Sequence, residues 1–550
     1  MKSSYSARFI LLFFVFFCNA QEKSPRLTVV LVIDQFAYHE LQKLLPFFKG
    51  GIKFLHDNGI RYINAFHAHG MPETGIGHTT IGTATWAKDH GIIGNSWINE
   101  KGNLVLCDQD NSPHAAVFSP DGTYNFGVSP KNIMVDALSD QLRLNSFPHA
   151  KNTIFSISLK SRSSVGMAGR LGNALWFDTK TGNFTSSKAY FKELPAWVKI
   201  FNKERNIQNM KSYTWDLTYP KDDQAYQFYD LEDYEYTGVK RSWIGTHEIN
   251  HNEKDPFLFF EKTPNANKLL LDFAHECLKT HITDNHNERF ILWLSLSSLD
   301  LIGHVYGPNS LELIDMLYHV DNQLNKFIQS LSQYVPLQET LFVLTADHGV
   351  FPILETLKKR GIPFAHRMNA DELIKVLNDG IEEKHGIKNA IAHFKMPCFY
   401  CSKEVCSSPR PRYNAIIEDI KKELMATPGI KAAWTYKELI QMPTLPRDLK
   451  QYYKNQLYHN RTGDIICQVQ PYNYIDTYTS GTAHGTPYDY DTHVPLIVYQ
   501  KGVHENKTIG TTVFTPQIGV TLAEILNVPR PSASTFDVLP GIITEKKLES

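Results

Sequence analysis

"LTVVLVID", residues 27–34, is apolar at almost every position and ends in an aspartate. Four later runs share this character: "NTIFSISLK" (152–160), "RFILWLSLSSLD" (289–300), "TLFVLTAD" (340–347) and "VPLIVYQ" (494–500). Runs this short and rich in β-branched residues are typical of strands buried on both faces of a parallel sheet. A helical pattern with apolar residues three and four apart lies between them, at 311–333. The alternation predicts an α/β fold, a three-layer sandwich around a mostly parallel sheet.

Length and charge narrow the class of protein further. The chain has 550 residues, 42% of them hydrophobic, which is ample for a large core. The formal net charge is −1, so no global charge indicates a nucleic-acid partner. Because no repeat or flexible linker divides the chain, we expect residues 21–550 to form one domain. Two long insertions, at roughly 161–288 and 350–480, are predicted to interrupt it.

The first twenty residues have the pattern of a secretory signal. Lys2 and Arg8 precede the apolar run "FILLFFVFFC", and small residues follow at Cys18 and Ala20. The run is short for a membrane span, which needs about 20 residues. We therefore predict a cleaved signal peptide at 1–20, no stable span in the mature chain, and export to the periplasm or the medium. A lipidated Cys18 is the alternative.

Cysteine usage fits an exported protein. Removing the signal leaves an even number of cysteines, which favours disulfide bridges in an oxidising compartment. A zinc or redox role for "CFYCSKEVC" (398–406) is the alternative. The six are Cys107, Cys277, Cys398, Cys401, Cys406 and Cys467.

Charged residues stand where four of the apolar runs end. They are Asp34, Lys160, Asp300 and Asp347. Ligands of open α/β sheets bind outside the carboxyl ends of the strands, so these side chains mark a candidate site. The alternative is that the aspartates only cap the helices that follow.

Histidines accompany these aspartates at spacings that suit a metal ion. In "LDLIGHVYGP", Asp300 and His304 are four residues apart, which places both on one face of a helical turn. Asp347 and His348 are adjacent in "LTADHGV", so joint ligation requires a bend, for which Gly349 is suited. His484 lies in a glycine-containing loop before the last apolar run.

Together with Asp34, these residues make three carboxylates and three imidazoles. Divided evenly, they suffice for two zinc-like sites with open positions. Two divalent ions about 4 Å apart suit in-line displacement at phosphorus. The alternative is that the histidines are ordinary surface or core residues.

An ordered series of motifs gives a more specific indication. Asp34 is followed by "TGIGHT" (74–79), "HGIIGN" (90–95), "KSR" (160–162), "DLIGH" (300–304), "ADHG" (346–349) and "AHG" (483–485). In this order the chain resembles the alkaline phosphatase superfamily of two-metal hydrolases. Within it, the chain is similar to exported alkaline phosphatases of the PafA type, which use a threonine nucleophile. The resemblance covers nearly all of the mature chain.

The resemblance implies a role for each motif. Thr74 would be the nucleophile and would also bind one metal, together with Asp34, Asp347 and His348. Asp300, His304 and His484 would hold the second metal. Asn95, Lys160 and Arg162 would contact phosphate. The implied cofactors are two Zn²⁺ ions, or other divalent ions, and the implied activity is hydrolysis of small phosphate monoesters through a phosphothreonyl intermediate.

The positive charge of Lys160 and Arg162, the implied phosphate contacts, helps to distinguish between the alternative functions. A monoester carries a dianionic phosphoryl group, and two cationic side chains favour it over a singly charged diester. The nearest alternative is a phosphodiesterase or nucleotide pyrophosphatase of the same superfamily; a non-catalytic phosphate-binding relative is a more distant one. The glycines after Thr74 would allow close backbone approach, and Thr74 would begin or precede a helix whose N-terminus faces the phosphate.

Overall fold

The computed structural model describes residues 24–542, apart from 120–123, 125, 147–150, 231–234, 239–241, 284, 286 and 287. The expected signal peptide at 1–20 therefore lies outside the described residues. Among the helices that are described, none has the length and apolar character needed to cross a bilayer.

A nine-stranded sheet forms the centre of the molecule. Its order is β10 (Asn183–Thr185), β9 (Asn173–Asp178), β8 (Asn152–Ser158), β13 (Arg289–Leu296), β1 (Leu27–Ile33), β14 (Thr340–Thr345), β22 (Leu496–Tyr499), β2 (Ile60–Tyr62) and β23 (Lys507–Ile509). The five neighbours from β9 to β14 are parallel, whereas β22 runs antiparallel to β14. The mostly parallel sheet is confirmed, and all five apolar runs are strands of it.

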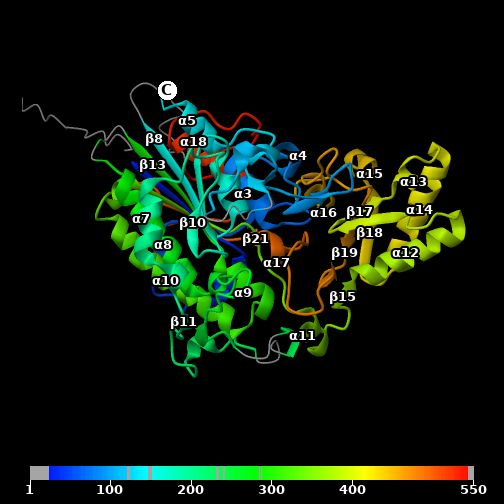
Figure 1. The fold of residues 1–550 in the computed structure, drawn as a ribbon, viewed down its shortest axis with the longest axis horizontal. Helices are drawn as coiled ribbons and strands as arrows, with labels where there is room; N and C mark the ends of the chain where they lie inside the picture. The colour runs from blue at the N-terminus through cyan, green and yellow to red at the C-terminus, as the bar shows by residue number, and fades with distance from the viewer. Residues whose placement is uncertain are drawn as a thin grey trace, which may run out of the picture.

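Side chains of the central strand β1 alternate between two cores. Leu31 and Ile33 pack with α8 (Pro264–His281) and α10 (Leu311–Leu331). Val30 and Val32 pack with α3 (Thr74–Thr83), α5 (Leu138–Leu144), α6 (Ser161–Ala168) and α18 (Pro516–Ile525). Because both faces are covered by helices, the strand needs no polar face, which explains its continuous apolar sequence. Figure 1 shows the two helical layers on either side of the sheet.

The range 161–288 takes part in these layers. It supplies α6 and α8, and its strands β9 and β10 extend the sheet at one edge. Between β10 and α8 the chain forms α7 (Ala196–Arg205) and a hairpin of β11 (Ser212–Trp215) and β12 (Gly245–Glu248). The sheet thus continues into the range that the sequence assigns to the first insertion.

The range 350–480 contains a lobe with its own sheet and core. Four strands follow the order β16 (Ile391–Lys395), β17 (Cys398–Cys401), β19 (Ile465–Val469), β18 (Ile430–Thr435). The helices α12 (Ala370–His385) and α14 (Arg410–Ala426) cover this sheet, with Leu377, Ile420 and Phe399 in the shared core. Figure 1 shows the lobe to the right of the main body.

The expected disulfide bridges are not formed. All six cysteines are free thiols. Cys398 and Cys467 stand on the neighbouring strands β17 and β19, but they face different cores. Cys398 packs with Trp434, whereas Cys467 packs with Ile416. Two side chains on opposite faces of a sheet cannot be bridged without moving the backbone.

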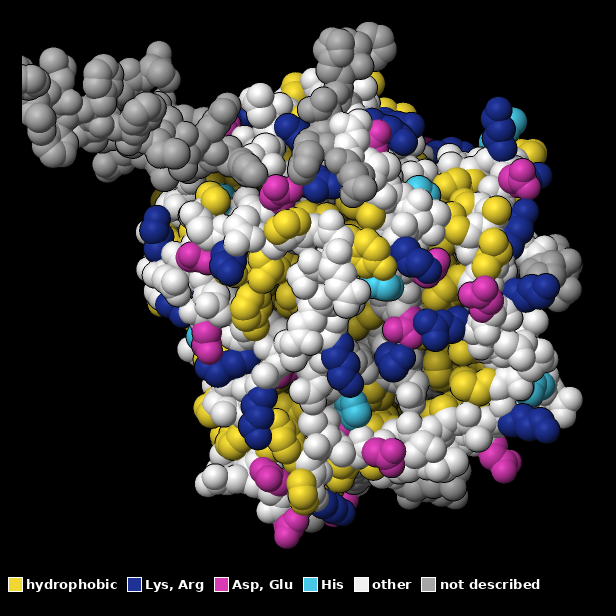
Figure 2. Space-filling view, turned by 90° about the vertical axis from the view of Figure 1, so that its left-hand side faces the viewer, with side chains coloured by type: hydrophobic (Ala, Val, Ile, Leu, Met, Phe, Trp, Pro, Cys, Tyr) yellow, Lys and Arg dark blue, Asp and Glu magenta, His cyan; other side chains and the backbone are white. Residues whose placement is uncertain are grey.

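Charges of both signs are mixed on the surface. On the face drawn in Figure 2, Lys and Arg side chains are interspersed with Asp and Glu. This face therefore presents no extended field of one sign.

Candidate metal centre and anion site

The strand-end residues predicted from the sequence meet at one edge of the sheet. Lys160 follows β8, Asp34 follows β1, and Asp347 follows β14 by two residues. Asp300 lies in the first turn of α9 (Ser298–Tyr306), directly after β13. Since these four strands are parallel neighbours, their carboxyl ends bring the four side chains together.

Asp34, Asp347 and His348 form a first cluster, which is fully buried. Their ligand atoms all lie within 4.8 Å of one another. His348 Nε2 is 3.4 Å from both Asp34 Oδ1 and Asp347 Oδ2. None of these three buried atoms has a hydrogen-bond partner. Unpaired buried polar atoms are costly, and a cation bound among them would satisfy all three.

Asp300, His304 and His484 form a second cluster under the same 4.8 Å criterion. Asp300 Oδ1 is 3.2 Å from His304 Nε2 and 3.6 Å from His484 Nε2. Asp300 and His304 share one face of α9, as their spacing predicts. The side chain of His304 is 38% exposed, so this cluster, unlike the first, opens to solvent.

All three imidazoles are oriented for ligation. Each ring nitrogen Nδ1 lies about 3 Å from a backbone carbonyl, to which it donates, leaving Nε2 for the cluster. The pairs are His304 with Thr482, at 3.0 Å, His348 with Gly349, at 3.0 Å, and His484 with Pro72, at 2.9 Å.

Electrostatics also fit divalent cations. Burial and the charge of Asp347 raise the pKa of Asp34 well above its usual value, a repulsion that a cation would relieve. Burial lowers the pKa of both His348 and His484, which favours the neutral imidazole that binds metals. The pKa of His304 is raised instead, because Asp300 outweighs burial. A mixed set of carboxylate oxygens and imidazole nitrogens suits zinc and similar ions.

Lys160 lies between the two clusters. Its Nζ donates to Asp34 Oδ2 at 2.7 Å and also contacts Asp300 Oδ2. Burial alone would raise the pKa of Asp300, but the Lys160 ammonium and the His304 imidazole hold it well below its usual value. Lys160 is the N-cap residue of α6, and Arg162 stands in the first turn with an unpaired Nε. Two cationic side chains at a helix N-terminus are suited to bind an anion.

Thr74 begins α3 and is buried. The backbone N–H of Gly75 donates to Asn95 Oδ1 at 2.8 Å, so the Asn95 amide group remains available as a donor. A Cβ on Gly77 would lie 2.5 Å from the carbonyl oxygen of Asp347, so only glycine allows this approach. The structure therefore places the start of α3 against the first cluster. Every site residue predicted from the sequence lies in this region, while the catalytic and ligand roles stay predictions.

Two further residues at the site, His78 and Gln35, are not among the site residues predicted from the sequence. His78 lies one helical turn after Thr74; its Nδ1 donates to the Thr74 carbonyl at 2.9 Å and is 3.3 Å from Asp347 Oδ2. The side chain of Gln35 donates to Asp300 Oδ1 at 2.8 Å. The spacing from Thr74 to His78 is a signal that could have identified His78, whereas nothing in the sequence distinguishes Gln35.

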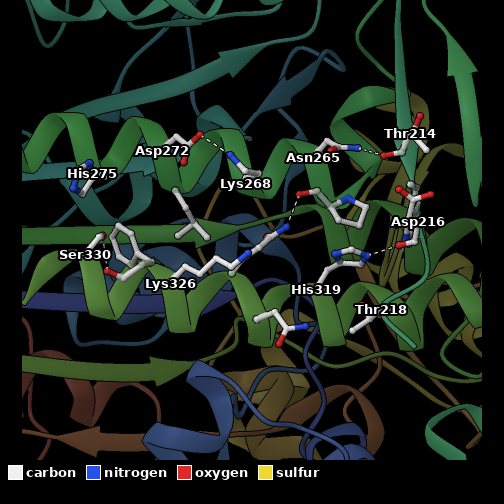
Figure 3. A pocket seen from close by; sticks show the side chains of 16 residues that line it. Thr214, Asp216, Thr218, Asn265, Lys268, Asp272, His275, His319, Lys326 and Ser330 are labelled. Atoms are coloured by element: carbon white, nitrogen blue, oxygen red, sulfur yellow. Dashed lines mark hydrogen bonds and ion pairs between the residues drawn. The ribbon is translucent and has the colours of Figure 1, made fainter. Parts of the chain in front are cut away.

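A separate cavity of about 650 Å³ lies between α8 and α10. Figure 3 shows some of its polar side chains paired with neighbours, among them Asn265 with the carbonyl oxygen of Thr214. Lys268 contacts Asp272 at 3.0 Å, and His319 Nε2 lies 2.8 Å from the carbonyl oxygen of Asp216. The hydroxyl of Thr218 and the amide oxygen of Gln323 are unpaired there, but among the described residues no three His, Cys, Asp or Glu ligand atoms converge in this cavity.

Comparison with known proteins agrees with the geometry. Residues 28–493 match the family model for type I phosphodiesterase / nucleotide pyrophosphatase. A protein named calcium-transporting ATPase from Myroides odoratus is 29% identical, over 95% of this chain and 96% of its own length. Alkaline phosphatase PafA from Elizabethkingia meningoseptica is 28% identical, over 94% of both chains.

The fold has a solved counterpart. The crystal structure of wild-type alkaline phosphatase PafA superposes with a TM-score of 0.82 at 25% identity, covering 94% of this chain and 99% of that one. These homologies support phosphoesterase activity. The chain belongs to the type I phosphodiesterase / nucleotide pyrophosphatase family of the alkaline phosphatase superfamily, and its relatives over nearly the whole length include alkaline phosphatases of the PafA type.

Proposed function

We propose that this protein hydrolyses phosphate monoesters, with Thr74 as the nucleophile. The observation that carries the proposal is the pair of three-residue clusters, which meet at the carboxyl edge of the sheet with the Lys160 ammonium between them. Asp34, Asp347 and His348 would hold one divalent ion together with Thr74; Asp300, His304 and His484 would hold the other. Bound there, two Zn²⁺ or similar ions would supply Lewis-acid stabilisation of the oxygens at phosphorus.

The chain's own residues supply positioning and charge. The Thr74 hydroxyl gives up its proton to water and its oxygen attacks phosphorus; a new P–O bond forms as the bond to the ester oxygen breaks opposite to it. The leaving oxygen keeps the bonding electrons and takes a proton from water. Water then cleaves the phosphothreonine, which returns the Thr74 hydroxyl and releases phosphate. The N-terminus of α3, which begins at Thr74, favours the anionic group.

Lys160 and Arg162 support the choice of a monoester. Both stand at the start of α6, where the helix dipole adds to their charge. A dianionic phosphoryl group offers free oxygens to the ammonium, to the fork of the guanidinium and to the Asn95 amide. A diester has one negative charge and an extra substituent, so it gains less from the same groups.

A comparison of substrates tests the monoester proposal. We expect p-nitrophenyl phosphate to be hydrolysed with a higher kcat/KM than bis-p-nitrophenyl phosphate. In the double variant Lys160→Ala, Arg162→Ala, monoesterase activity should fall by about 10²-fold or more, and diesterase activity far less. Equal losses, or a native preference for the diester, would favour the phosphodiesterase named by the family model.

Phosphoenzyme trapping tests the nucleophile. Thr74→Ala should form no acid-stable phosphoenzyme and should lose monoesterase activity, while elemental analysis still finds close to two divalent ions per chain. Thr74→Ser, which keeps a hydroxyl, is the matched control and should retain both signals. A phosphoenzyme in Thr74→Ala would exclude Thr74 from the proposed role, and phosphate binding without turnover in the native protein would identify a non-catalytic relative.

We also propose that the protein is exported. The signal-like sequence at 1–20 supports this. N-terminal sequencing of the secreted or periplasmic protein should show a chain that begins near residue 21; a mature protein that starts at Met1 would contradict export by this route.

A further inference from the structure

A second cavity, of about 600 Å³, lies directly beside the solvent-open cluster. His304 lines it, together with Leu301 and Val305 of the same helix, α9. The opposite wall comes from the inserted lobe, where Phe394 and Lys395 end strand β16. The cavity is therefore bounded by the main body on one side and the lobe on the other.

The two clusters differ in their access to this cavity. Asp34, Asp347 and His348 are wholly buried, whereas His304 is 38% exposed and faces the cavity. In an in-line displacement, the nucleophile and the departing oxygen stand on opposite sides of phosphorus. With Thr74 on the side of the buried cluster, the alcohol part of the ester leaves on the side of His304. The cavity is where that alcohol part fits.

Aromatic side chains contribute to the cavity wall. Tyr478, in the loop after β20 (Asn473–Asp476), is 75% exposed at the cavity. Phe394 lines it from the lobe and packs on Phe399 at 4.7 Å between ring centroids. Rings such as these favour a flat aromatic group, through offset or edge contacts.

The charges around the cavity are unbalanced. Lys262 and Lys395 both line it. The carboxylate of Asp476 also lines it, but the Arg367 guanidinium holds that carboxylate at 3.1 Å. Lys395 is 3.8 Å from Glu73, the residue before Thr74, so the lobe brings a cation close to the nucleophile. Lys395 is itself within ion-pair distance of Glu73, but among the charged side chains that line the cavity two lysines accompany one aspartate, and this imbalance suits an anionic substituent on the leaving group.

We propose that this cavity is a leaving-group site, and that it selects phosphate monoesters of aromatic alcohols that carry a second negative charge. Tyr478 and Phe394 contact the ring, and Lys395 and Lys262 contact the anionic substituent. The proposal rests on the proposed function, because it requires Thr74 and the two clusters to act on a monoester.

The contact between Tyr478 and the aromatic ring is tested by comparing kcat/KM for two substrates. General effects on catalysis change both values alike and cancel in their ratio. We expect Tyr478→Ala to lower the ratio of kcat/KM for phenyl phosphate to kcat/KM for methyl phosphate by about five- to tenfold. Tyr478→Phe, which keeps the ring, should restore the native ratio. Leu445→Ala is the matched control, because Leu445 is another exposed side chain of the lobe, 76% exposed, and does not line the cavity.

The charge contact is tested in the same way. Lys395→Gln should lower the ratio of kcat/KM for 4-carboxyphenyl phosphate to kcat/KM for phenyl phosphate by about three- to tenfold at low salt. Lys388→Gln removes a lysine whose side chain is 80% exposed and which does not line the cavity, so it should leave this ratio unchanged.

The outcomes separate the two proposals. If the native protein hydrolyses neither phenyl nor methyl phosphate, the proposed function fails and the leaving-group site fails with it. If it hydrolyses both, and Tyr478→Ala and Lys395→Gln leave both ratios native, the leaving-group site alone is wrong. A lowered ratio in Tyr478→Ala or in Lys395→Gln, with native ratios in Leu445→Ala and Lys388→Gln, supports the leaving-group site.

Discussion

Gln35 connects the two clusters through a strained backbone. Its N–H donates to Asp347 Oδ1 at 3.1 Å, and its side chain donates to Asp300 Oδ1 at 2.8 Å. Its φ is +69°, a conformation that costs a residue with a side chain about 1–3 kcal/mol. Gly303 makes room for the side chain, since a Cβ there would lie 1.9 Å from Gln35 Oε1. Strain kept at such a position indicates that the two contacts matter to the site.

Replacing Gln35 should weaken metal binding. In Gln35→Ala, the carboxylate of Asp300 loses a buried donor that orients it, and we expect the affinity for the second ion to fall about 10- to 100-fold. Metal content against a graded series of chelator concentrations measures this directly. Gln141→Ala, on α5 and bonded to Asp136, is the control. If Gln35→Ala keeps its metal at the same chelator concentrations as the native protein, the contact of Gln35 with Asp300 is only structural.

His90 should make stability depend on pH. Its ring is fully buried, with Nδ1 accepting from the Ile92 N–H and Nε2 paired with the Thr80 hydroxyl, each at 3.1 Å. Burial and the nearby Arg461 lower the pKa of His90 to about 3. Because the unfolded chain has a higher histidine pKa, about 6.5, it binds more protons below that pH. The contribution of neutral His90 to the stability of the folded protein is present above pH 6.5 and is lost as the pH falls toward 3.

Denaturant unfolding at two pH values measures this effect. Between pH 7.5 and 5.5, the free energy of unfolding of the native protein should fall by about 1.4 kcal/mol more than that of His90→Asn. The comparison with the variant removes the contribution of the other histidines. Parallel pH dependence in both proteins would mean that the pKa of His90 is not depressed in the fold.

At the scale of elements, the contact of α3 with α6 positions Thr74, the proposed nucleophile, relative to Lys160 and Arg162. The two helices approach through Gly82 and Gly166, where a Cβ on Gly82 would lie 2.4 Å from the Gly166 carbonyl oxygen. A Cβ on Gly166 would lie 2.9 Å from Thr79 N. This backbone contact fixes the helix that begins at Thr74 against the helix that begins after Lys160.

Gly82→Ala should therefore disturb both stability and activity. The helices must separate to admit the methyl group, and we expect a loss of about 1–3 kcal/mol in the free energy of unfolding. Because in-line attack depends on position, kcat should fall more than KM changes. Gly510→Ala is the control, since nothing lies within 4 Å of its added Cβ. Unchanged kcat in a destabilised Gly82→Ala would show that the helix contact serves the fold alone.

The elements that could be predicted from the sequence are those encoded by a local pattern of residues. The five apolar runs predict the central strands because a doubly covered strand needs no polar face, and the Asp300–His304 spacing predicts a shared helix face. The absence of disulfides was not predicted, because it depends on which face of the lobe's sheet Cys398 and Cys467 occupy. The bond from Gln35 to Asp300 joins residues far apart in sequence, so no local pattern encodes it.

At the scale of the whole molecule, cations should contribute to stability. Without them, the buried carboxylates of Asp34 and Asp347 repel each other, and burial raises the pKa of Asp34. Chelation should lower the Tm, and zinc at 100 times its Kd should restore about 2.7 kcal/mol for each site. Calorimetry measures both. His304→Ala, which removes a partly exposed side chain, should recover about half of the zinc-dependent gain; full recovery would contradict its role as a ligand.

Neither cluster is contained in one stretch of chain. The first joins Asp34 to Asp347 and His348, and the second joins Asp300 and His304 to His484, which precedes β22 late in the chain. The first set of ligands is therefore complete only when residue 348 is available, and the second only when His484 is, close to the end of the 550 residues. In the export proposed above, a chain that crosses the membrane unfolded would bind both ions only after it has crossed, so the metal supply outside the cytosol would determine which ions it carries.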